Sequence, residues 1–120
     1  MAGEYAQRIG RFCRFTMREI RDEKALDAAG KAYRIVLDPQ GRHLGSDEFA
    51  ALIQKAENGA ARELVFLVGG ADGLSAAARQ KADLLLALSR FTLPHELARV
   101  VLVEQIYRAF AILRHHPYAR

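Results

Sequence analysis

The sequence is poor in cysteine and contains no long apolar run. Its one cysteine, Cys13, excludes an intramolecular disulfide, as is usual for proteins of a reducing cytoplasm. No stretch approaches the ~20 consecutive apolar residues that a membrane-spanning helix requires. The first residues, Met1 to Tyr5, lack the charged and then apolar regions of a signal peptide. We therefore expect a cytoplasmic chain with no membrane association.

Composition indicates one small globular domain with a mild basic bias. A chain of 120 residues forms a domain with a modest core, and a hydrophobic content of 51% is ordinary for a globular protein. Lysine and arginine number 18 against 14 aspartate and glutamate residues, which gives a net charge of +4. This excess suits a polyanionic partner but does not require one.

The N-terminal part predicts a helix, a strand and a helical turn. The helix covers Glu4 to Ile9 and is ended by Gly10. From residue 13 to residue 18, apolar and polar side chains alternate, which is typical of a strand with one buried and one basic face. The apolar positions are Cys13, Phe15 and Met17, and the polar positions are Arg14, Thr16 and Arg18. A helical turn over Ala25 to Ala29, closed by Gly30, follows.

The middle of the chain alternates between predicted strands and helices. Tyr33 to Leu37 predicts a strand, ended by the turn residues Asp38-Pro39-Gln40-Gly41. Ser46 is the expected N-cap of a helix that Asn58-Gly59 closes. Glu63 to Val68 predicts a strand buried on both faces, as in a parallel sheet covered by helices.

The C-terminal half predicts two further helices. Ser75 caps the first, over Ala76 to about Leu86, and Pro94 occupies the first position of the second. The buried face of the second helix consists of Val103, Tyr107, Phe110 and Leu113. Alternating strands and helices predict an α/β fold, in which helices cover a mainly parallel sheet through right-handed crossovers.

Three loops are expected at the carboxyl edge of this sheet. They are Leu37 to Gly41, Gly69 to Gly73 and Leu88 to His95. Ligands of α/β sheets collect at this edge, so the three loops together indicate one binding pocket. The glycine loop, Gly69 to Gly73, has neither the G-x-G-x-x-G nor the Walker pattern. A tight turn that needs positive φ also explains it.

Weaker signals come from scattered polar residues. Glu104 and Arg108 are spaced to pair on one helical face, and a surface ion pair explains them. His115 and His116 are adjacent and have no third ligand in a suitable position, so we expect no metal site. Asp72 is either a turn residue or a general base. The lone cysteine is expected in the core rather than as a nucleophile.

Four segments occur in the order and at the spacing of one known family. They are Leu67 to Ser75, Leu88 to His95, Glu104 to Ala109 and His116 to Tyr118. They resemble the ribosomal RNA large subunit methyltransferase H family, the pseudouridine methyltransferases of the SPOUT class. The match covers about residues 33 to 120, and the loop that starts at Leu37 is similar to the family's first cofactor loop.

The resemblance implies a trefoil knot in the C-terminal half, S-adenosylmethionine as cofactor, and a homodimer whose active sites use residues of both subunits. The implied reaction methylates a pseudouridine of large-subunit ribosomal RNA on the assembled ribosome, at the ring nitrogen N3. The implied cofactor contacts are Leu37, Gly69, Gly70, Leu88, Ser89, Arg90, Phe91, Thr92, Leu93 and Pro94. The implied catalytic candidates are Arg108, Tyr118, Arg120 and His95. We expect the dimer to form through the last helix, with Tyr107 and Phe110 partly at the interface.

Two features depart from the family pattern. Family members begin with an apolar strand and a loop before the helix expected at Glu4 to Ile9, so the single domain of residues 1–120 lacks the family's first strand; the connection from Ile20 to Tyr33 is also short. In addition, Ala119 stands where the family has histidine. These departures leave a second interpretation open, a shortened or engineered knotted variant that binds the cofactor or RNA without turnover.

Overall fold

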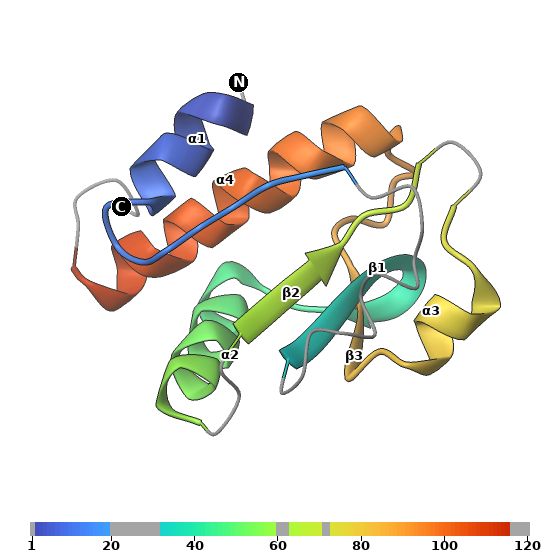
Figure 1. Ribbon diagram of the computed structural model, residues 1–120, viewed down its shortest axis with the longest axis horizontal. Helices are drawn as coiled ribbons and strands as arrows, with labels where there is room; N and C mark the ends of the chain where they lie inside the picture. The colour runs from blue at the N-terminus through green and yellow to red at the C-terminus, as the bar shows by residue number, and fades with distance from the viewer. Residues whose placement is uncertain (1, 20–31, 60–62, 71–72, 116–120) are drawn as a thin grey trace.

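The computed structural model describes residues 2–19, 32–59, 63–70 and 73–115. Its helices are α1 (Ala2–Ile9), α2 (Ser46–Asn58), α3 (Ala76–Gln80) and α4 (His95–Leu113), and its strands are β1 (Ala32–His43), β2 (Glu63–Leu67) and β3 (Leu84–Ala87) (Figure 1). They confirm the predicted α/β fold. No helix in these ranges is long and apolar enough to cross a membrane. The helical turn expected over Ala25 to Ala29 lies outside the described residues.

β1 is the central strand of a parallel sheet with the order β2-β1-β3. The chain steps from β1 to β2 through α2 and then returns past β1 to β3 through α3. Because such crossovers are right-handed, steps in opposite directions put their helices on opposite faces. Figure 1 shows this arrangement, with α2 and α4 on one side of the sheet and α3 on the other. The carboxyl ends of the three strands therefore lie at one edge, between helices of both layers.

β1 is interrupted where the sequence predicts a turn. Leu37 and Arg42 both lie opposite Leu86 of β3, so the residues between them loop out of the ladder. Asp38 Oδ1 accepts a hydrogen bond from the backbone N–H of Gln40 at 2.9 Å, the local bond that favours aspartate in turns. The predicted turn is therefore confirmed, but the strand resumes after it.

The helix predicted over Ala76 to about Leu86 is wrong in its second half, which is strand β3. α3 ends at Gln80, and β3 begins at Leu84. Asp83 fixes β3 against β1, because its Oδ2 accepts a bond from the N–H of Arg34 at 2.8 Å and its N–H donates to the carbonyl of Arg34 at 2.8 Å. A short apolar run has no periodicity that separates a buried strand from a helix.

Residues 14–19 form an extended segment that belongs to no strand of the described sheet. The strand predicted over residues 13–18 is therefore wrong. Cys13 and Phe15 pack against the core cluster, and Figure 1 shows the segment alongside α4. Alternation of period two marks an extended backbone with one buried face. Here a helix provides the covering surface in place of a neighbouring strand.

Two predicted helix starts are displaced by one residue. Gly45 rather than Ser46 is the N-cap of α2, and its N–H donates to Glu48 Oε1 at 2.9 Å. Ser46 Oγ instead donates to Gln105 Oε1 of α4 at 2.9 Å. Pro94 is the N-cap of α4 rather than its first residue.

β2, predicted to be buried on both faces, is an edge strand whose residues stay partly exposed.

Helix α4 lies at the centre of the core. Its buried residues Leu102 and Ile106 share one cluster with Ile53 of α2 and Ile35 of β1. Tyr107 and Phe110 are 6% and 5% exposed.

Aromatic contacts explain the burial of these last two rings. The ring centroids of Tyr107 and Tyr5 lie 6.0 Å apart, and Phe110 stacks on Phe12 at 5.6 Å. The expectation that Tyr107 and Phe110 lie partly at a dimer interface is therefore wrong, because α1 and the residues after it already cover them.

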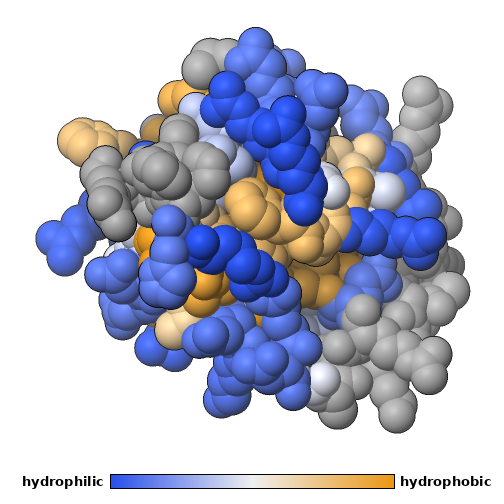
Figure 2. All heavy atoms as spheres, turned by 90° about the vertical axis from the view of Figure 1, so that its left-hand side faces the viewer, coloured by the Kyte–Doolittle hydropathy of each residue, from blue (hydrophilic) through white to orange (hydrophobic). Residues whose placement is uncertain are grey.

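Figure 2 views the end of the molecule at the left of Figure 1, and shows apolar surface ringed by hydrophilic side chains.

Cys13 packs against the core as predicted. Its burial raises the pKa of the thiol, the Glu57 carboxylate raises it further, and Arg114, which pairs with Glu57 at 3.0 Å, lowers it. The thiol therefore stays protonated near neutral pH.

We expect iodoacetamide to alkylate Cys13 more slowly in the folded protein than in the unfolded chain at pH 8, because the thiolate is the reactive form. Glu57→Gln should speed alkylation of the folded protein, since it removes a charge that raises the pKa. Because the pKa of the thiol is raised in the folded protein, the unfolded thiol loses its proton at lower pH. The stability that this pKa difference contributes is therefore present below the unfolded pKa and is lost as pH rises through the folded pKa. Equal rates for wild type and Glu57→Gln would contradict the role of Glu57.

Candidate functional site

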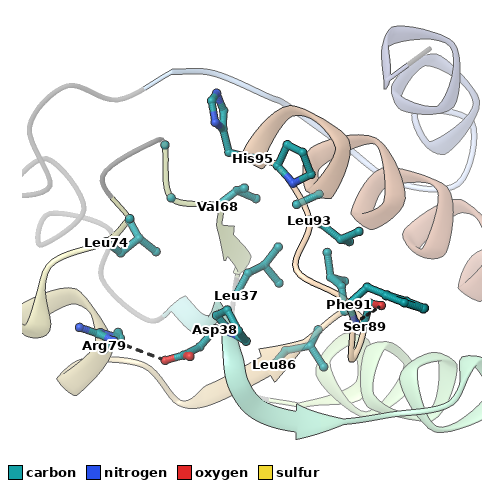
Figure 3. Close-up of a pocket in the computed structure, with 17 residues that line it drawn as sticks. Leu37, Asp38, Val68, Leu74, Arg79, Leu86, Ser89, Phe91, Leu93 and His95 are labelled. Atoms are coloured by element: carbon teal, nitrogen blue, oxygen red, sulfur yellow. Dashed lines mark hydrogen bonds and ion pairs between the residues drawn. The ribbon is translucent and has the colours of Figure 1, made fainter.

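The three loops expected at the carboxyl edge surround one cavity of about 470 Å³. Figure 3 shows side chains from β1, from the residues around the glycine loop and from the start of α4 lying around this space. Cavities of this size are typical of small-molecule sites. The topology explains the position, because the chain reverses direction across the sheet at β1 and opens a crevice there.

An ion pair connects the first loop to α3. Arg79 Nη1 lies 3.7 Å from Asp38 Oδ2, and the two side chains are 50% and 12% exposed (Figure 3). Pairs as exposed as this contribute less than about 1 kcal/mol to stability, so its main effect is to hold the carboxylate at the wall of the cavity. Sequence reasoning missed Arg79. The sequence pointed to Arg79 as a residue of this site only through its position, four residues after the predicted cap Ser75.

The glycine loop combines a tight turn with a close backbone approach. Gly73 has φ of 74°, and its N–H donates to the carbonyl of Gly70 at 2.9 Å. A Cβ on Gly69 would lie 2.9 Å from the backbone carbon of Gly73, so no larger residue fits there without a shift. Gly69, Gly70 and Gly73 also line the cavity. The described residues of this loop therefore have the positive φ expected of a tight turn and also form part of the pocket wall.

The third loop, Leu88 to His95, is shaped by a serine. Ser89 Oγ accepts a hydrogen bond from the N–H of Phe91 at 2.9 Å. Phe91 lines the cavity although it is 83% exposed. Pro94 then caps α4, whose first residue, His95, also lines the cavity.

The structure gathers most of the implied cofactor contacts at this cavity. Its wall contains Leu37, Gly69, Gly70, Leu88, Ser89, Phe91, Leu93 and Pro94. Arg90 and Thr92 alternate with the lining residues of the third loop and are exposed. The wall also contains Val68 and Leu74, which flank the glycine loop and were not singled out from the sequence.

Arg108 lies away from this cavity. Its Nε and Nη2 donate to Glu104 Oε2 at 3.1 and 2.8 Å, so the predicted helical pair is confirmed. An α-helix rises about 1.5 Å per residue, which puts Arg108 roughly 20 Å along α4 from His95. Arg108 therefore does not reach the cavity of its own chain. Tyr118 and Arg120 lie outside the described residues.

The wall is suited to a small molecule with a flat ring and a polar tail. Leucine and proline residues supply apolar contact, and Gly69, Gly70 and Gly73 have no side chains to cover their backbone groups. Among the described residues that line the cavity, the ionisable side chains are those of Asp38, Arg79 and His95. Within the described ranges, no group of three or more His, Cys, Asp or Glu residues is arranged to hold a metal ion.

Comparisons with known proteins agree with this chemistry. A family model described as "Predicted SPOUT methyltransferase" matches residues 1–119. A protein of Solibacter usitatus named ribosomal RNA large subunit methyltransferase H is 51% identical over 123 residues, which cover 100% of this chain and 87% of that protein. Proteins of the same name from Geobacter sulfurreducens and Limosilactobacillus reuteri are 42% and 38% identical; each alignment covers 96% of this chain, and 85% and 86% of the respective relative.

Proposed function

The chain belongs to the SPOUT methyltransferase family, and we propose that it transfers a methyl group from S-adenosylmethionine to large-subunit ribosomal RNA. The relatives named above carry this RNA in their names. One observation supports the proposal most strongly: three loops that are far apart in the sequence line one cavity of small-molecule size. These are the loops that the family resemblance implies as cofactor contacts.

The residues of the cavity fit S-adenosylmethionine. The apolar side chains of Leu37 and Leu88 suit the adenine, and the open backbone at Gly69 and Gly70 can bond its edge or the methionine tail. Backbone groups of the third loop, including those of Arg90 and Thr92, complete the proposed contacts. When bound, the cofactor supplies an activated methyl group. The chain then mainly has to align this group with its acceptor and exclude water.

We further propose that the acceptor is N3 of a pseudouridine, reached on the assembled ribosome in the cytoplasm. This nitrogen has to lose a proton before it attacks, so a nearby base or cation lowers the barrier. His95, the first residue of α4 and one of the residues that line the cavity, is the candidate for that role in the same chain. Arg108 lies roughly 20 Å along its own helix from His95, so it would act from the second subunit of a homodimer. The family resemblance implies a catalytic role for Tyr118 and Arg120 as well. The trefoil knot stays a prediction.

Two linked measurements test the proposed function. Calorimetric titration with S-adenosylmethionine should show saturable binding with one ligand per chain or per dimer. Labelled cofactor should transfer its methyl group to large ribosomal subunits and leave small subunits unlabelled as the control. Absence of binding by the wild-type chain would overturn the proposal. Binding without transfer, in both wild type and Ala119→His, would favour the binding module instead.

The proposed dimer has its own test. Light scattering at micromolar concentration should give twice the mass of one chain. A monomeric mass at that concentration would contradict an active site shared between subunits.

A further inference from the structure

The extended segment of residues 14–19 carries arginines that the core does not use. Arg14 and Arg18 are exposed, whereas Cys13 and Phe15 beside them pack against the core cluster. Neither arginine pairs with an acidic side chain in the part of the chain that the structure describes. An exposed guanidinium without an acidic partner is suited to bidentate contact with a phosphate group.

The segment leads to the cofactor cavity. Figure 1 shows it running along α4 toward the N-terminal end of that helix, and Figure 3 shows it passing that end on the side of His95. Its path is fixed at the start, because Phe12 stacks on Phe110 at 5.6 Å. Arg14 and Arg18 are four extended residues apart, at most ~13 Å. They can therefore contact two separate points on a nucleic acid backbone.

More positive charge lies near the cavity mouth. Arg90 in the third loop and Arg99, one helical turn after His95, are exposed. The acidic residues in these segments are Glu19 and Glu96, so arginines predominate. A surface with this balance attracts a phosphate backbone toward the cavity.

We propose that Arg14 and Arg18 form a phosphate track that guides a strand of ribosomal RNA along α4 to the cavity mouth. The inference rests on the proposed function, because the guided strand would carry the nucleotide that is methylated. Phosphate contacts position a nucleic acid without selecting its sequence. The track therefore acts on affinity for the ribosomal particle and not on the chemistry in the cavity.

The test compares Arg14→Gln/Arg18→Gln with a matched control, Arg42→Gln/Lys55→Gln, which removes the same charge from exposed positions on β1 and α2. Binding of large ribosomal subunits is measured for each protein at several salt concentrations. The track variant should bind about tenfold more weakly or worse, and its slope of log affinity against log salt should fall by about two. The control should bind like wild type. Affinity for S-adenosylmethionine should be unchanged in both variants.

Methyl transfer to the same particles separates this inference from the proposed function. In an active wild type, the track variant should raise the KM for the particle and leave kcat unchanged. Equal binding by wild type and the track variant overturns the track, as do equal losses in the track variant and the control. If the wild type transfers no methyl group, the proposed function fails, and particle binding alone decides whether the track exists. Stronger binding to anionic lipid vesicles than to the subunits also overturns it.

Discussion

Gly41→Ala is expected to lower the free energy of unfolding by about 2–3 kcal/mol, the usual cost of forcing an extra group into a packed position. A Cβ at this position would lie 2.6 Å from the backbone carbon and oxygen of Leu85 in β3. Backbone atoms cannot rotate away as a side chain can, so the loop of β1 has to separate from β3. Asp38 and Pro39 in that loop line the cavity. Affinity for S-adenosylmethionine should therefore fall with stability.

Gly3→Ala is the matched control for this change. It adds the same methyl group to α1, where no neighbouring atom lies within 4 Å. Since alanine favours a helix over glycine, stability should stay equal or rise by up to about 1 kcal/mol. Denaturant unfolding and calorimetric titration measure both variants. An equal stability of Gly41→Ala and Gly3→Ala would contradict the close contact of the loop with β3.

Phe110→Ala should cost more, about 3–5 kcal/mol of unfolding free energy. The ring is 5% exposed, stacks on Phe12 with an interplanar angle of 10° and lies under the guanidinium of Arg114 at 5.7 Å. Domains of this kind are stable by only about 5–15 kcal/mol. A loss of this size therefore removes a large share of the total.

The same variant should release the extended segment from α4, because Phe12 loses its stacking partner. Trypsin should then cleave after Arg14 and Arg18 at a protein concentration and time at which wild type stays intact. Leu97→Ala serves as the control, since Leu97 is 47% exposed and surface changes usually stay within about 0.5 kcal/mol. A loss below about 1 kcal/mol for Phe110→Ala would show that the surroundings repack around the missing ring.

The sequence predicted the elements that have clear periodicity or turn chemistry. The apolar stripe after Ser46, the strands starting at Tyr33 and Glu63, and the helix after Pro94 all form, and the alternation of strands and helices predicted the parallel sheet. The convergence of three loops on one cavity followed from the same pattern, because parallel strands end at one edge.

The errors have a common physical origin, since local patterns do not say which surface will cover a segment. The alternation at Cys13 and Phe15 indicated an extended backbone correctly, but a helix and not a sheet covers it. The apolar run at Leu84 suited either a helix or a strand. Two hydrogen bonds between Asp83 and Arg34, which is distant in sequence, hold this run in the sheet. The ion pair of Arg79 with Asp38 also depends on the tertiary fold alone.

Because β1 is interrupted, one wall of the cavity is formed by residues that do not take part in the pairing of the sheet. β1 leaves the ladder at Leu37 and rejoins it at Arg42, and both residues face Leu86. Because these two residues bracket the loop, we expect an insertion between Asp38 and Gln40 to leave the pairings on either side unchanged, provided that Gly41 keeps its close contact with β3. We therefore expect a change in the length of this loop to reshape the cavity wall at Asp38 and Pro39 while the sheet keeps its pairing.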